Sequence, residues 1–118
     1  TAVRFSSGFG GGMGRLREVC GTFSGAVIVV NALYGYSDPK NVQAKAELYS
    51  RIQELAAQFR RDNGSIICKE LLGLSRPEGS PIPEARTDEY YKKRPCPELC
   101  RYSANMLEEY IREHPPVK

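Results

Sequence analysis

The chain has 118 residues, 41% of them hydrophobic, which is enough for one core. Its formal net charge of +3 comes from interleaved acids and bases without a basic and aromatic stripe, so we expect no nucleic-acid partner. The longest apolar stretch, residues 25–33, is too short to span a bilayer, and no signal-type leader opens the chain, so we expect no membrane insertion. Four cysteines beside a sufficient core do not indicate a secreted disulfide scaffold, and we expect a reducing, cytoplasmic location.

The first third of the chain predicts a helix end, a joint and a long buried element. Residues 1–5 are typical of the end of a helix, which leaves open that the single helical domain predicted for residues 1–118 lacks its first helix. The glycine-rich residues 10–14 predict a tight joint between elements. Residues 17–34 are apolar nearly all round, as in a buried helix or strand, and their length favours a helix. Gly21 and Gly25 lie on one face of it, where another helix could pack closely, and a helical interaction domain would form a homodimer through this face.

A second helix is predicted to begin at Asp38 and Pro39, a capping carboxylate followed by proline. It ends at Asn63 and Gly64. Its apolar positions step by three or four residues, as one face of a helix requires. They are Val42, Ala46, Tyr49, Ile52, Ala56 and Phe59.

The rest of the chain predicts two more helices around a long loop. Ser65 can cap a short helix that carries Cys68 and ends at Gly73. Residues 74–95 hold four prolines and predict a long loop, with one helical turn around residues 88–91. The last helix begins at Cys96 and Pro97 and stops before residues 115–116. Its apolar face consists of Leu99, Ser103, Met106, Leu107, Tyr110 and Ile111.

No stretch alternates as a half-buried strand does, so the predicted fold is all-α. About four helices would pack as a bundle or orthogonal array, with one long proline-rich loop.

Taken one by one, the cysteines differ in how strongly they indicate chemistry. If Pro97 is the first helical residue, Cys96 is the cap, where the helix-end amides favour a thiolate. Cys100 lies one turn further, so it could resolve a sulfenate on Cys96 or form a disulfide with it, or equally fill the core. Cys20 follows Arg15 and Arg17, whose charges would favour its thiolate, although Cys20 and Cys68 alone are typical of buried, inert thiols.

Several other kinds of site are excluded or disfavoured. The glycine run lacks the Gly-Lys-Ser/Thr of a phosphate loop and the glycine spacing of a dinucleotide site. A haem attachment motif is absent, and the single histidine, His114, is expected to be solvated at a helix end. Without a placed histidine, Cys/His and Ser/His hydrolytic sites lack their base.

Several blocks in one order resemble a known family. They are residues 9–15, Cys20-Gly21-Thr22-Phe23-Ser24-Gly25, Leu33-Tyr34-Gly35, residues 63–73 and Cys96-Pro97. Together they resemble, over roughly residues 5–111, the putative redox-active family named for a Cys, a Gly-Cys-Ala-x-x-Gly-like motif and two further Cys. Thr22 stands where alanine is expected.

The resemblance implies a site. Cys20, Cys68 and Cys96 occupy three of the family's four cysteine positions, the fourth lying before Thr1, and Cys100 is an additional cysteine. We take these four cysteines as the candidate catalytic residues. The positions expected to bind a cofactor are Gly12, Gly14, Arg15, Gly21 and Gly25.

Three functions remain open. The first is a thiol oxidoreductase with an unknown redox partner, in which Cys96 or Cys20 cycles and Cys68 or Cys100 resolves. The second is an electron-transfer protein that binds zinc or an iron–sulfur cluster through Cys20, Cys68 and Cys96, although close Cys-x-x-Cys pairs are absent. The third is a helical interaction domain whose cysteines only fill space.

Overall fold

A computed structural model describes residues 1–72 and 95–116 of the chain. Three long helices form its body, α3 (Gly21–Tyr34), α4 (Val42–Asn63) and α7 (Cys96–Glu113). Four short elements complete the described residues: α1 (Ala2–Ser6), the 3-10 helix η1 (Ser7–Phe9), α2 (Gly10–Met13) and α5 (Cys68–Leu71). The described part of the chain contains only an isolated bridge, Val19 with Ile67, and no named strand. The all-α prediction is therefore confirmed.

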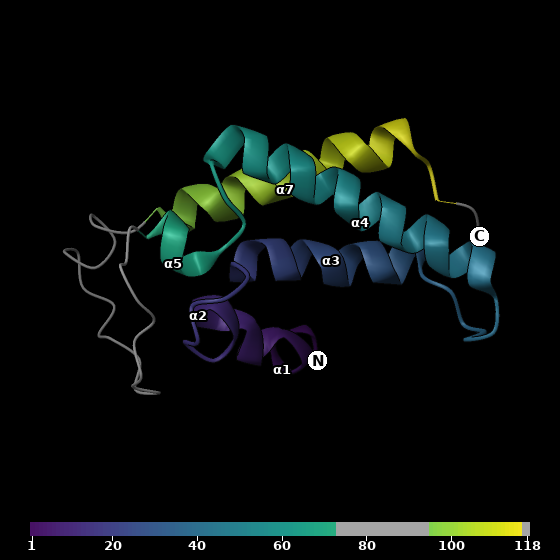
Figure 1. Cartoon of the computed structure of the whole chain (residues 1–118), viewed down its shortest axis with the longest axis horizontal. Helices are drawn as coiled ribbons and strands as arrows, with labels where there is room; N and C mark the ends of the chain where they lie inside the picture. The colour runs from purple at the N-terminus through teal and green to yellow at the C-terminus, as the bar shows by residue number, and fades with distance from the viewer. Residues whose placement is uncertain (73–94, 117–118) are drawn as a thin grey trace.

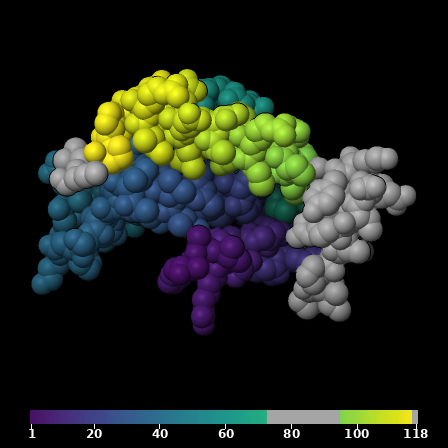
Figure 2. Space-filling model, turned by 180° about the vertical axis from the view of Figure 1, so that it is seen from behind, coloured from purple at the N-terminus to yellow at the C-terminus, as the bar shows by residue number. Residues whose placement is uncertain are grey.

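The helices gather several of their ends at one end of the molecule. α4 runs opposite to α3 and α7, and α1 and α2 lie on the far side of α3 from α4 (Figure 1). The beginnings of α3 and α7 therefore lie at the same end, together with α2 and α5. Figure 2 shows the opposite face, where α7 covers α3 and the N-terminal residues project beneath it. Among the described helices, none has both the length and the apolar character needed to cross a membrane.

The core lies between the three long helices. Phe59 of α4 is fully buried, and its ring meets Phe23 of α3 and Tyr102 of α7 edge to face, at centroid distances of 5.7 and 5.5 Å. Aromatic pairs in this geometry add to the stabilisation from burial. The other buried core residues on these helices are Ala26, Val30, Leu48, Leu55, Leu99, Met106 and Tyr110.

The predicted helix over residues 17–34 begins four residues later than expected. Arg17 has a φ of 62°, which an α-helix cannot continue. The chain then pairs with the segment before α5, through hydrogen bonds from Cys20 N to Ile66 O (2.7 Å) and from Cys68 N to Glu18 O (2.5 Å). The apolar residues Val19 and Cys20 thus belong to this short pairing and not to the helix. Hydrophobic periodicity alone could not distinguish the two.

The second predicted helix begins at Val42, because Asn41 caps it and Asp38 does not. Asn41 Oδ1 accepts a hydrogen bond from Ala44 N at 3.0 Å, while Asp38 Oδ1 accepts one from Lys40 N in the preceding turn. The predicted end is confirmed, with Gly64 at a φ of 92°. The predicted apolar face is partly wrong, since Val42 and Tyr49 are exposed and Leu48 is buried.

The remaining boundaries show one correction and one confirmation. The short third helix begins at Cys68, because Ser65 Oγ accepts from Ile67 N and donates to Glu70 Oε1, which makes it part of a turn. α7 begins at Cys96 and ends at Glu113, as predicted, with most of the expected face buried. Residues 73–94 lie outside the described residues. They include Gly73, all of the predicted loop except residue 95, and the predicted turn at residues 88–91.

His114 is half-buried and not fully solvated as expected. Its ring stacks on Tyr110 at a centroid distance of 4.2 Å, and its carbonyl accepts a hydrogen bond from Tyr34 Oη at 2.6 Å. The guanidinium of Arg51 lies over the ring of Tyr34, at 4.2 Å. Burial raises the pKa of Tyr34. These contacts join the ends of α3 and α7 away from the cysteines.

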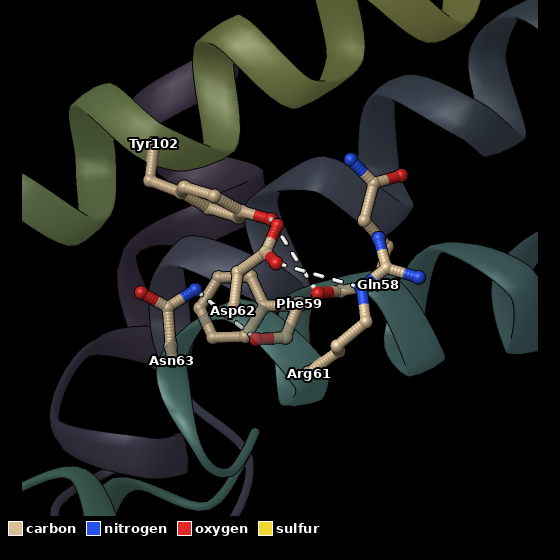
Figure 3. Close-up of polar contacts among 6 residues, drawn as sticks. All are labelled: Gln58, Phe59, Arg61, Asp62, Asn63 and Tyr102. Atoms are coloured by element: carbon tan, nitrogen blue, oxygen red, sulfur yellow. Dashed lines mark hydrogen bonds and ion pairs between the residues drawn. The ribbon is translucent and has the colours of Figure 1, made fainter.

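A polar contact joins α7 to α4 at the edge of the core (Figure 3). Tyr102 Oη donates a short hydrogen bond to Asp62 Oδ2 and lies 3.4 Å from Gln58 O, and Arg61 pairs with Asp62 at 3.5 Å. Burial, and next the bond to Asp62, raise the pKa of Tyr102 to about 12. The same bond is the main cause of a lowered pKa at Asp62.

The stabilisation from this contact is expected to depend on pH at both ends of the range. The Tyr102 pKa rises from 10.0 to about 12 on folding, so its contribution is complete below pH 10 and is lost as pH rises toward 12. The Asp62 pKa falls below 3.8 on folding, so its contribution is present above that pH and is lost in stronger acid. In urea unfolding, the free energy of unfolding of the wild type should exceed that of Tyr102→Phe most between these two pH limits. A difference that stays constant from acid to alkali would contradict this assignment.

Candidate functional site

A cavity of about 400 Å³ lies where the helix ends gather, and all four cysteines line it. Cys20 and Cys68 are buried, Cys96 is half-buried and Cys100 is exposed. The sulfur-bearing residues come from α3, α5 and α7, which are far apart in sequence. Other lining residues are Ser6, Ser7, Phe9, Gly10, Gly11, Gly12, Arg17, Gly21, Thr22, Gly25 and Leu72. The fold therefore brings the four predicted cysteines to one space.

Three of the cysteines stand at the beginning of a helix. Cys20 is the cap of α3, and Cys96 is the first residue of α7, where Pro95 is the cap. The predicted cap role thus belongs to Cys20, while Cys96 lies one position further in. Cys68 begins α5, which is a single turn. The amides at the start of a helix carry partial positive charge, so the starts of α3 and α7 bring such charge to the end of the molecule where these cysteines lie, although neither helix has a side-chain cap hydrogen bond.

Cys100 lies one turn after Cys96 on α7, as expected from its spacing. Cys100 is exposed to solvent, so the alternative that it fills the core is wrong. The buried position of that turn is Leu99 instead.

The short pairing between the segments before α3 and α5 places Cys20 and Cys68 on the same face of the paired segments. Val19 and Ile67 form the bridge, so the next residues, Cys20 and Cys68, both point to its other face. Such diagonal positions typically have Cα atoms about 7–8 Å apart, slightly beyond the reach of an unstrained disulfide. All four cysteines are thiols, with no disulfide among them in the described residues. Closing an inner disulfide would need a small backbone movement.

The glycine segment approaches Cys68 more closely than any side chain could. Gly11 and Gly12 have φ values of 66° and 68°, in the left-handed region. A Cβ on Gly12 would lie 2.6 Å from Cys68 Cβ and 2.7 Å from Glu18 N. The predicted joint is therefore a wall of the cavity. Gly14 and Arg15, two of the expected binding positions, belong to this segment but are not among the described lining residues.

Arg17 contributes the one charged side chain among the described lining residues. It is 4% exposed, and its Nη1 lies 3.8 Å from Cys68 Sγ. The sequence suggested Arg17 as a neighbour of Cys20, and the structure shows its contact with Cys68. The Arg17 guanidinium is therefore a positive group in contact with the sulfur of Cys68.

Thr22 makes a polar contact with the sulfur of Cys20. Its Oγ1 lies 3.1 Å from Cys20 Sγ, and its carbonyl accepts a hydrogen bond from Ser103 Oγ of α7 at 2.8 Å. Sequence reasoning did not include Thr22 or the serines of the N-terminal segment in the site. The one available signal was Thr22 at a position where alanine was expected.

Gly21 and Gly25 have different surroundings. A Cβ on Gly21 would lie 2.9 Å from Phe9 O, so the close approach expected there is made by η1 of the same chain. Gly25 lines the cavity, and a Cβ added to it would meet nothing within 4 Å. A homodimer through this face stays a prediction.

The expected three-cysteine metal site has no counterpart in the arrangement of the described side chains. Among them, no group of three or more His, Cys, Asp or Glu residues is placed to hold one metal ion. The sulfurs of Cys20, Cys68 and Cys96 border a common cavity instead of meeting at a point.

The fold and site define a helical protein that collects cysteines from separate helices around one cavity. A family model, Putative redox-active protein (C_GCAxxG_C_C), matches residues 1–110. The chain belongs to this family, as its motifs predicted. No curated protein and no solved structure matches it.

Proposed function

We propose that this protein carries out reversible thiol–disulfide chemistry with the cysteines of the cavity. The observation that carries the proposal is that four thiols from three helices face one space of about 400 Å³. Buried cysteines that only fill a core would be surrounded by side chains, whereas these border a cavity large enough for a small molecule or an extended peptide group. The family's redox-active description agrees with this chemistry.

The thiolate is the nucleophile in disulfide exchange, and two kinds of positive group stand near the sulfurs. Cys20 and Cys96 lie at the starts of helices of 14 and 18 residues, and Arg17 faces Cys68. Cys96 is more accessible than Cys20 and Cys68, so we assign it the first contact with a partner. Cys20 and Cys68 form the inner pair of the same proposal.

The reaction needs a disulfide-containing partner as oxidant, and it runs in two exchanges. A protein thiolate attacks one sulfur of the partner disulfide, so that a mixed disulfide forms and one partner thiolate leaves. A second protein thiolate then attacks the protein sulfur of the mixed disulfide, which closes a protein disulfide and releases the second partner thiolate. Two protein thiols are oxidised and one disulfide is reduced, and the protons from the protein thiols pass to the released thiols. The reverse sequence regenerates the thiols.

Two further assignments belong to this proposal. Gly12, Gly21 and Gly25 shape the cavity wall, so they contribute to binding through the space that they leave. A reducing intracellular compartment would keep four cysteines as thiols, which supports a cytoplasmic location.

Counting thiols in the native protein tests the proposal. Equilibration with a small disulfide should remove thiols in pairs from the four present, and a dithiol reductant should restore them. Peptide mapping should place the disulfide among Cys20, Cys68 and Cys96. Cys100→Ser serves as a matched control and should keep a reversible pair, since three cavity cysteines remain. If the thiol number stays unchanged, or falls without being restored, the proposal is wrong.

A further inference from the structure

We propose that Thr22 is a positioning residue for Cys20, because its hydroxyl donates a hydrogen bond to the thiolate that attacks or leaves in disulfide exchange. This inference rests on the proposed function. Its basis is the distance of 3.1 Å between Thr22 Oγ1 and Cys20 Sγ, in a partly buried contact two residues apart.

The direction of the hydrogen bond follows from the charge of the sulfur. A thiol can donate or accept, but a thiolate has no proton and only accepts. Once Cys20 is ionised, the hydroxyl of Thr22 is the donor.

The hydroxyl is held in place before the sulfur ionises. Thr22 is the second residue of α3, and its backbone carbonyl is tied to α7 by Ser103 Oγ at 2.8 Å. A β-branched side chain in a helix has few rotamers. The carbonyl four residues earlier, a common acceptor for a helical threonine, belongs to Glu18, which lies before the helix begins. Cys20 is therefore the partner that the geometry gives to this hydroxyl.

The consequence is a more reactive Cys20 and a more oxidising disulfide. A donor that stabilises the thiolate stabilises the reduced form, which makes the corresponding disulfide a stronger oxidant. One hydrogen bond of this kind corresponds to a change of about three- to tenfold in an equilibrium or rate constant. Tenfold in the exchange equilibrium equals about 30 mV.

The test compares Thr22→Val, which keeps the branched shape without the hydroxyl, with Thr22→Ser, which keeps the hydroxyl. Iodoacetamide, a small neutral alkylating agent, is applied to each native full-length protein at one pH, and peptide mapping gives the rate at every cysteine. We expect Thr22→Val to slow the alkylation of Cys20 about three- to tenfold while Cys68 and Cys96 keep their rates. Thr22→Ser should restore most of the Cys20 rate. Equilibration in a dithiol redox buffer should show Thr22→Val more oxidised than wild type by a similar factor.

Two outcomes would overturn the inference: an unchanged Cys20 rate in Thr22→Val, or equal slowing at every cysteine, which would indicate a structural effect. The alkylation ratio does not require a disulfide to form. If the wild type forms no reversible disulfide, the proposed function fails while the Thr22 contact is still measured. If the disulfide forms and Thr22→Val leaves both readouts unchanged, the role of Thr22 alone is wrong.

Discussion

Gly12→Ala is expected to destabilise the protein by about 3 kcal/mol and to displace Cys68 from the cavity. The added Cβ would lie 2.6 Å from Cys68 Cβ and 2.7 Å from Glu18 N, and one of these neighbours is backbone. Overpacking of this kind costs about 1–3 kcal/mol, and a left-handed torsion on alanine adds about 1–2 kcal/mol. The backbone of Glu18 is held by its hydrogen bonds to Gly12 and Cys68, so it cannot move without breaking the pairing beside the site.

Urea unfolding of Gly12→Ala and Gly14→Ala separates the contact from the torsion. Gly14 has a φ of 57°, and a Cβ there would meet nothing within 4 Å. Its replacement should cost about 1 kcal/mol, the torsional part alone. Alkylation of Cys68 in the folded state should become faster only in Gly12→Ala, because only that change displaces its neighbour. Equal losses of stability in the two variants would show that the glycine wall does not press on Cys68.

Local patterns were enough to predict helices in this protein, but not where each begins. α7 has a proline near its start and prolines after its end, so both bounds could be predicted. Asp38 and Asn41 are both good caps, and which one is used depends on how the chain enters from the turn after α3. The start of α3 depended on a pairing with residues 66–68, which are distant in sequence. Such a contact leaves no periodic signal.

The site was predictable as a set of cysteines but not as a geometry. Cys20 and Cys68 by themselves are typical of buried thiols, and only the family motif indicated that they act with Cys96. Sequence proximity pointed to Arg17 as a neighbour of Cys20, and its contact with Cys68, which is 51 residues away, could not be predicted. Thr22 required the exact path of the first turn of α3. The cavity itself results from helix ends meeting, which composition and spacing do not encode.

Two aromatic contacts of Phe59 connect α3 and α7, so Phe59→Ala is expected to have the second large effect. Phe59 is fully buried between Phe23 and Tyr102. Phe23 follows Cys20 by three residues, and Tyr102 follows Cys100 by two. Its removal leaves a cavity at the point that fixes α3 against α7. Phenylalanine-to-alanine changes in cores cost about 3–5 kcal/mol, a large part of the stability of a domain of this size.

Urea unfolding should show this loss for Phe59→Ala and a smaller one, about 1 kcal/mol, for Phe59→Leu, which refills much of the space. Tyr49→Ala on the same helix is the control, because Tyr49 is 52% exposed and its removal should change the free energy of unfolding by less than about 0.5 kcal/mol. Alkylation of Cys20 and Cys68 should accelerate in the order Tyr49→Ala, Phe59→Leu, Phe59→Ala, since opening of the fold adds a second route to the reaction through the cavity. If Cys20 stays as protected in Phe59→Ala as in Tyr49→Ala, the aromatic contact does not hold the site together. An intact cavity in Phe59→Leu would show that filling this space, more than the ring itself, fixes the two helices.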